Sequence, residues 1–182
     1  LAKHLASCGE VGGRAQEAFL AYRRKTGRVV RVRRGLYAVI PPGADSDSYP
    51  VDPFLVAAKL TPDSVLSHHT ALQLHGKAHS VHTHITYLAS RPLGLLTFRS
   101  HAFRGTRFQR TLLRTGKVHA GVSIKERAGM ELRVASLERT LVDVLDRPAL
   151  SGSWEEIWRS LESVEFFDLD KVVEYALLLG NA

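Results

Sequence analysis

An arginine-rich segment near the N-terminus carries the residues best suited to chemistry with an anion. Arg28, Arg31, Arg33 and Arg34 fall within seven residues, interleaved with valines and followed by Gly35. A guanidinium group is planar, stays charged and donates paired hydrogen bonds to a phosphate. The pattern therefore predicts either a phosphate-binding hairpin or an ordinary solvated basic surface, and the elements around it must decide between the two.

Histidines form a second candidate site, because six of them occur between residues 68 and 84. His82 and His84 are expected on one face of a strand, where two imidazoles could bind a metal ion. A hydrolytic metal site also needs carboxylates, and Asp63 is the only acid in residues 60–122. A metal-dependent hydrolase built on His68–His84 is one alternative, and helix capping and packing roles are the other. We expect no enzymatic activity and no cofactor.

Charge is divided unevenly along the 182 residues, whose formal net charge is +7. Residues 1–40 carry a net +7 and residues 41–127 a net +6, whereas residues 128–182 carry a net −6. Such asymmetry is expected when one end of a protein meets a polyanion and the other does not, although surface charge also drifts without function. The composition, 45% hydrophobic and 24% charged, is that of a globular protein with a buried core.

Other function classes find little support in the sequence. The single cysteine, Cys8, excludes an internal disulfide, which fits the reducing cytoplasm where we expect the protein. No apolar run reaches the roughly 18 residues of a membrane span, so no membrane partner is expected. The chain has no G-x-S-x-G motif and no glycine-rich phosphate loop. Asp143 and Asp146 could form a pair of carboxylates for acid–base chemistry, but no other feature of the sequence supports that role.

The elements that would position the arginines form a small N-terminal domain over residues 1–43. A short helix ends near Ser7, and three glycines make a turn before a second helix. On that second helix an apolar stripe recurs at helical spacing and is expected to be buried: Ala15, Ala18, Phe19 and Tyr22.

A hairpin follows the second helix. Val30 and Val32 alternate with Arg31 and Arg33, as in a strand with one buried face, so both arginines are expected on the other face. Arg34-Gly35 makes the turn, "LYAVI" returns as the second strand, and residues 44–50 form a polar linker.

Helix, turn, helix and hairpin in this order are the minimal elements of a winged helix-turn-helix domain. In such a domain the second helix enters the major groove, and the hairpin, called the wing, presses cations against the phosphate backbone. We therefore expect contacts with double-stranded DNA from both elements: Arg14, Gln16, Arg23, Arg24, Lys25, Arg28, Arg31, Arg33 and Arg34.

Residues 51–182 predict a mixed α+β domain, so that the whole chain belongs to the α+β class. A helix begins at Pro53, and a second, capped by Ser67, precedes a run of strands. The expected strands cover residues 82–90, 95–103, 110–116 and 119–126, and the expected helices that follow cover residues 136–148, 153–163 and 168–180.

Two of the later helices carry side chains whose role the pattern leaves open. Leu137, Leu141, Val144 and Leu145 are expected to form a buried stripe. Arg139 and Asp143 are expected to form an ordinary i,i+4 pair in solvent, worth about 0.3–0.5 kcal/mol. Trp154 and Trp158 belong either to the core or to a surface for a partner.

The ordered segments together resemble the AbiEi-family antitoxins. The resemblance rests on the arginine-rich stretch ending in Gly-Leu-Tyr, on "TALQLHG" (Thr70–Gly76) and on "ERTLVDVL" (Glu138–Leu145), and it extends over residues 27–175. It implies an N-terminal winged helix that binds inverted repeats in operator DNA and represses its own operon. It also implies a C-terminal antitoxin domain that counteracts a cognate nucleotidyltransferase toxin, with or without direct contact. A stand-alone DNA-binding transcriptional regulator without a toxin is the alternative.

Overall fold

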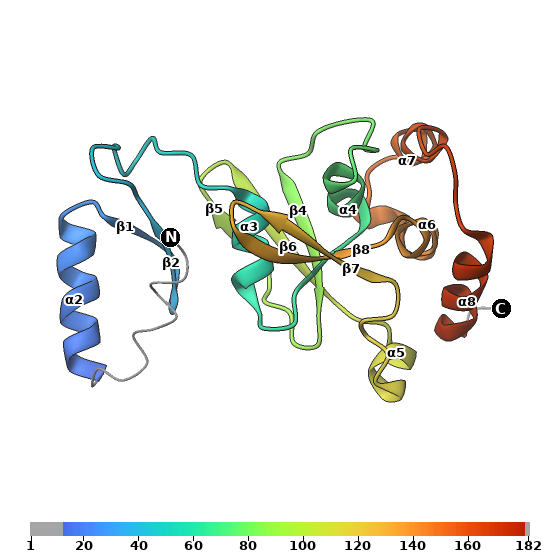
Figure 1. Cartoon of the computed structure of the whole chain (residues 1–182), viewed down its shortest axis with the longest axis horizontal. Coiled ribbons are helices and arrows are strands. Elements are labelled where there is room, and N and C mark those ends of the chain that lie inside the picture. Colours follow the sequence, from blue (N-terminus) through green and yellow to red (C-terminus); the bar gives the residue numbers. More distant parts are fainter. Residues whose placement is uncertain (1–12, 181–182) are drawn as a thin grey trace. The chain divides into compact units, whose positions relative to one another are not determined.

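The computed structural model describes residues 13–180. The chain divides into two compact units, the first ending at Asp52 and the second beginning at Pro53 (Figure 1). Helices and strands occur in both units, which confirms the expected α+β class. The helix expected to end near Ser7 lies outside the described residues.

From residue 13 onward, the first unit consists of one helix and one hairpin. Helix α2 (Gly13–Lys25) leads through a short turn into β1 (Val29–Arg33), which pairs antiparallel with β2 (Leu36–Val39). Among the described residues of this unit, the buried apolar side chains are those of Val29, Val32 and Ile40. Residues 44–50, expected as a linker, form a turn in the same unit, in which the Asp45 carboxylate accepts hydrogen bonds from Asp47 and Ser48.

The second unit is built on one mixed six-stranded sheet of order β5-β6-β4-β3-β8-β7 (Figure 1). Strands β4 and β6 are parallel, as are β3 and β8, and the remaining pairs are antiparallel. The strands are β3 (Val65–Leu66), β4 (His84–Ala89), β5 (Leu96–Phe98), β6 (His101–Arg107), β7 (Val122–Arg127) and β8 (Met130–Ala135).

Six helices accompany this sheet in the described part of the second unit. They are α3 (Pro53–Leu60), α4 (His68–Leu74), α5 (Arg110–Thr115), α6 (Leu137–Asp146), α7 (Trp154–Glu162) and α8 (Leu169–Leu179). The last three begin with side-chain caps: the Ser136 and Asp168 side chains accept from backbone N–H groups three residues on, and Ser153 and Glu156 form a capping box. Ser67, which the sequence predicts as the cap of α4, forms no side-chain cap hydrogen bond.

Residues 110–116 differ from the sequence-based expectation, because they form helix α5 and not a strand. Short apolar runs do not distinguish the two by periodicity. Here Leu112 and Leu113 pack into separate hydrophobic clusters, and Gly116, with φ of +69°, ends the helix in the left-handed conformation. Strands β3 and β8 were not predicted from the sequence. Strand β3 has only two residues, too few for a periodic pattern, and β8 follows its hairpin partner β7 after a short turn.

Candidate nucleic-acid interface

Helix α2 presents the charged residues of its last turn to solvent. Arg14 and Gln16 fall in its first turn, and the Gln16 side chain is exposed. Arg23, Arg24 and Lys25 occupy the last turn and are exposed as well. Cations at this end interact favourably with the negative pole of the helix dipole, so the helix tolerates three adjacent positive charges.

The apolar stripe of α2 is exposed, contrary to expectation. Phe19 is 45% exposed and Tyr22 63% exposed, and Ala15 and Ala18 are exposed too. The Arg23 guanidinium lies over the Phe19 ring, 4.9 Å from its centre. The sequence period correctly predicted a helix, but the described residues of the first unit do not cover its apolar side.

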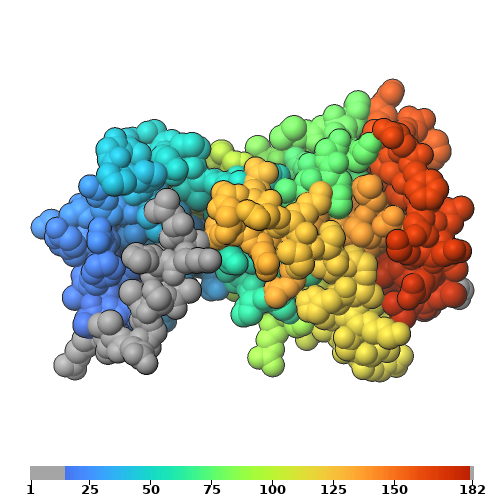
Figure 2. Space-filling model, in the orientation of Figure 1, coloured from blue at the N-terminus to red at the C-terminus, as the bar shows by residue number. Residues whose placement is uncertain are grey.

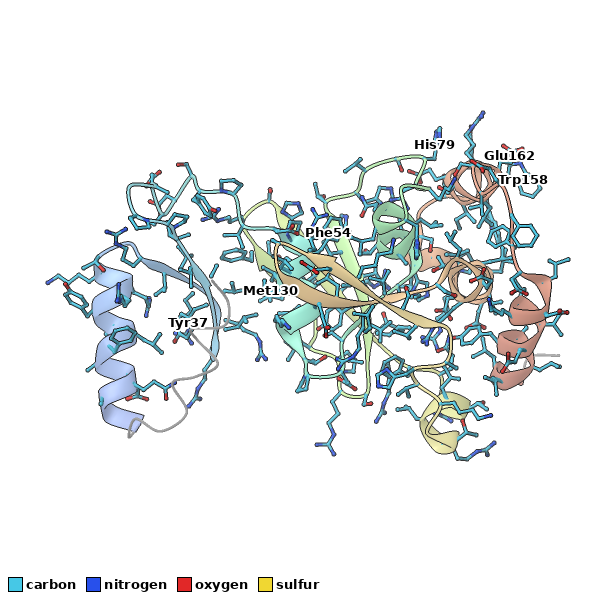
Figure 3. The ribbon with its side chains drawn as sticks, viewed as in Figure 1. Tyr37, Phe54, His79, Met130, Trp158 and Glu162 are labelled. Atoms are coloured by element: carbon cyan, nitrogen blue, oxygen red, sulfur yellow. The ribbon has the colours of Figure 1, made fainter. Side chains whose placement is uncertain are left out.

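A bulge in the hairpin changes the expected arrangement of the arginines. Arg31 lies opposite Tyr37 (labelled in Figure 3), and Arg33 lies opposite Leu36, because the register shifts between the two arginines. Leu36 and Tyr37 are neighbours on one strand, so their side chains point to opposite faces. Arg31 and Arg33 therefore do not share a face, and Val29 and Val32, not Val30 and Val32, are the buried valines.

The cations of the hairpin thus differ in availability. Arg33 is half-buried and already has a partner within the chain, and Arg28 is half-buried. Arg31 and Arg34 are exposed, and neither side chain forms an ion pair or hydrogen bond with any residue in the described range 13–180. Arg34 stands in the two-residue turn, where Gly35 adopts φ of +80°.

Backbone hydrogen bonds tie the hairpin to the helix. The Arg28 N–H donates to the Arg23 carbonyl at 2.8 Å, and the Ile40 N–H donates to the Arg28 carbonyl at 2.9 Å. The Thr26 hydroxyl also donates to the carbonyl of Tyr22 at 3.1 Å. The cations at the end of α2 and those of the hairpin are consequently held on one small body.

The second unit contains a buried ionic network, built around an ion pair that the sequence pattern predicted to be exposed to solvent. The Arg139 Nε and Asp143 Oδ2 atoms are 3.3 Å apart, and both side chains are 0% exposed. Arg139 also donates to the carbonyls of Val118 and Ala120, at 2.8 and 2.7 Å. The expectation of an exposed i,i+4 pair was wrong, because the buried face of α6 includes these two charged residues with Thr140 and Val144.

Further buried groups converge on the Asp143 carboxylate. The Tyr175 hydroxyl donates to its Oδ1 at 2.9 Å, and the Gln109 amide donates to the same oxygen at 3.1 Å. Burial, and then the negative charge of Asp143, raises the pKa of Tyr175 well above its usual value. The network joins α6, α8 and the start of α5, with no opening to solvent at Arg139 or Asp143, so its role is structural.

The histidines between residues 68 and 84 occupy several different environments. His82 precedes β4 and does not share a strand face with the exposed His84. The His82 ring stacks on His69 with centres 3.7 Å apart, and its Nε2 lies 3.0 Å from Glu156 Oε1. Within residues 13–180, no group of three or more His, Cys, Asp or Glu side chains could hold a metal ion. This geometry gives the metal-dependent hydrolase no support.

Apolar residues are exposed on the last helices of the second unit. Trp154 is 61% and Trp158 65% exposed, and Trp158 and Glu162 project from α7 in Figure 3. A core role for both tryptophans is thus excluded in this structure. Between α6 and α8 lies an apolar groove of about 420 Å³, lined by Leu141, Leu145, Val173 and Leu177 among others.

Comparison with known proteins identifies a fold relative. No family model matches the chain, and no curated protein matches it. Among solved structures, the chain is similar to the RV2827C protein from Mycobacterium tuberculosis, with 20% identity and a TM-score of 0.57. The match covers 97% of this chain but 62% of that protein, so this chain spans less than two thirds of its relative's length. At this identity the similarity shows a shared fold. No helix within residues 13–180 has the length and apolar character needed to cross a membrane.

Proposed function

We propose that the protein is a DNA-binding transcriptional repressor whose first unit is a winged helix-turn-helix. Helix α2 would enter the major groove, and the β1–β2 hairpin would lie against the phosphate backbone. The observation that carries the proposal is the pair of exposed arginines, Arg31 and Arg34, that have no partner among the described residues of the hairpin. Unpaired guanidinium groups on a rigid hairpin are suited to phosphate, and their neighbours on α2 to base edges.

The charge of the first unit supports this role. The cationic end of α2 and the hairpin are held together by the Arg28 backbone bonds, so both elements can meet one duplex at once. Phosphate contacts fix the protein on DNA, whereas side chains of the first helical turn read sequence. Gln16 is exposed in that turn, and Arg14 lies in it by position.

Neutralising the hairpin should weaken DNA binding and reduce its salt dependence. For Arg31→Gln with Arg34→Gln, the slope of log K against log salt on the DNA upstream of the gene should fall by about 1.8, because each lost phosphate contact removes about 0.9. Fluorescence anisotropy at several salt concentrations measures this slope. The control is Lys59→Gln with Arg159→Gln, which removes the same charge from exposed positions of the second unit.

Equal slopes for the hairpin and control variants would contradict phosphate binding by the hairpin. Loss of affinity at unchanged slope would indicate that the arginines support folding and do not contact phosphate.

The resemblance to AbiEi-family antitoxins supports a second part of the proposal, in which the second unit counteracts a nucleotidyltransferase toxin. Co-expression with a nucleotidyltransferase encoded beside the gene should restore growth that the enzyme alone arrests. The hairpin variant Arg31→Gln with Arg34→Gln should restore growth equally well when expressed from a foreign promoter, because the antitoxin role lies outside the wing. Failure of the unaltered protein to restore growth would favour a stand-alone regulator.

A further inference from the structure

Positive charge in the second unit is concentrated in one stretch of chain. Residues 64–125 contain nine Lys and Arg and no Asp or Glu, although the following residues 128–182 are acidic. Strands β4 and β6 are parallel, so the chain leaves both at the same edge of the sheet. Arg91 follows β4, and α5 follows β6, which brings their cations to that edge.

Helix α5 is held rigidly by its inner side. Leu112 packs with Tyr175 and Leu179 of α8, and Leu113 packs against the cluster that includes Val65. The Thr111 hydroxyl adds a hydrogen bond to the carbonyl of Leu179 at 3.2 Å. These contacts leave the outer side of α5 free of packing, and Figure 2 shows the segment, in yellow, on the outer surface.

Three exposed cations lie on α5 or directly after it, and we call them the α5 basic cluster: Arg110, Arg114 and Lys117. Arg110 and Arg114 are spaced i,i+4 and are therefore neighbours on the helix surface, and Lys117 comes directly after the residue that ends the helix. All three are exposed, and none forms an ion pair or side-chain hydrogen bond with a described residue.

Two arginines elsewhere in the same unit do have partners. Arg133 donates to the Pro62 carbonyl at 2.8 Å, and Arg159 pairs with Glu155 at 3.2 Å. Like charges at i,i+4, as in Arg110 and Arg114, disfavour a helix, and no acid of residues 64–125 offsets them. Arg110 and Arg114 thus repel each other in the free protein, and an anion from outside would offset this repulsion.

We propose that the α5 basic cluster binds the phosphodiester backbone of a nucleic acid, as a contact surface separate from the wing. Two of its cations lie along the exposed face of α5 and the third comes directly after the helix. This extended arrangement fits a linear polyanion, whereas a small anion needs groups that converge on one point. Nucleic acid presents a phosphate about every 3.4 Å along each strand, so a stretch of backbone can meet all three cations. A membrane-binding helix would expose apolar residues beside its cations, but α5 buries Leu112 and packs Leu113 inward.

The test compares two full-length double variants of equal charge. Arg110→Gln with Arg114→Gln alters the cluster, and Arg159→Gln with Lys171→Gln removes the same two charges from α7 and α8. Fluorescence anisotropy at several salt concentrations measures binding to a DNA duplex of random sequence and to a single-stranded RNA. Vesicles of equal parts phosphatidylcholine and phosphatidylserine provide the membrane comparison.

In the cluster variant, the slope of log K against log salt should fall by about 1.8 if the cluster contacts duplex DNA, or by about 1.4 if it contacts single-stranded RNA. The nucleic acid whose slope falls is the one that the cluster binds. The control variant should change neither slope by more than a small fraction of this. Equal slopes for the two variants on both nucleic acids, or a loss confined to vesicles, would overturn the proposal. The hairpin variant Arg31→Gln with Arg34→Gln tests DNA binding by the wing independently. A negative result for one surface therefore leaves the proposal for the other surface intact.

Discussion

Replacing Asp143 with alanine should lower the free energy of unfolding by about 3–5 kcal/mol, the range for a buried ion pair that loses one partner. The substitution leaves the Arg139 guanidinium in an interior where its side chain is 0% exposed. It also removes the acceptor for the Tyr175 hydroxyl and the Gln109 amide, which lie 2.9 and 3.1 Å from the carboxylate. The Arg139, Tyr175 and Gln109 donors would then all lose the carboxylate that accepts their hydrogen bonds, in a site that is closed to water.

Urea unfolding followed by circular dichroism measures this effect, and the chain supplies its own control. Arg159 and Glu155 form a pair with the same i,i+4 spacing, but their side chains are 53% and 76% exposed. Glu155→Ala should cost less than about 1 kcal/mol, because an exposed pair is screened by solvent. Similar losses for Asp143→Ala and Glu155→Ala would show that the Arg139–Asp143 pair is solvated in solution.

Acidification from pH 7 to pH 4 should destabilise the protein by about 3 kcal/mol through His68 alone. Burial lowers the pKa of this imidazole from 6.5 to about 4; the negative charge of Asp143 opposes this shift, whereas the positive charge of Arg147 adds to it. Because the folded pKa lies below the unfolded one, the contribution of His68 is complete above pH 6.5 and is lost as the pH falls towards 4. Each pKa unit corresponds to about 1.36 kcal/mol.

His68→Asn should flatten this part of the pH profile. Asparagine does not titrate, and it tolerates the left-handed backbone that His68 adopts, with φ of +53°. His119→Asn provides the control, since it makes the same substitution at an exposed histidine. An unchanged slope between pH 4 and pH 6.5 in His68→Asn would contradict the buried, neutral state of this histidine.

Local sequence signals predicted most of the elements. The sequence placed the last three helices within a residue of where α6, α7 and α8 begin, and the residues that precede them, Ser136, Ser153 and Asp168, accept backbone hydrogen bonds with their side chains. The turn at Arg34-Gly35 is also where the alternating pattern placed it. Caps and tight turns are determined by a few adjacent residues, which is why the sequence alone reveals them.

Burial was harder to predict because it depends on distant segments. Arg139 is buried since the carbonyls of Val118 and Ala120, some twenty residues earlier, accept its hydrogen bonds. Trp154 and Trp158 share a helical stripe with the buried Ile157, yet both remain exposed. Helical spacing defines a face but does not show how wide a face the neighbouring elements cover.

The hairpin shows the same limit at the candidate interface. Alternation of valine and arginine predicted a strand, but it did not reveal the shift of register between Arg31 and Arg33. A bulge adds one residue to one strand, and its place depends on how both strands pair. In the structure, Arg31 and Arg34 are the exposed arginines of the described hairpin, and neither side chain has a partner among the described residues.

Directed cleavage of DNA from the hairpin tests the central claim most directly. An iron chelate attached at Arg34→Cys, in a Cys8→Ser background, should cut the bound upstream DNA at a few positions next to the protein. The same chelate at Asp170→Cys, on α8 of the second unit, serves as the reference position. We predict focused cuts from position 34 that recur in both halves of an inverted repeat. Bound DNA left uncut from position 34, or cut evenly along its length, would contradict a wing on the phosphate backbone.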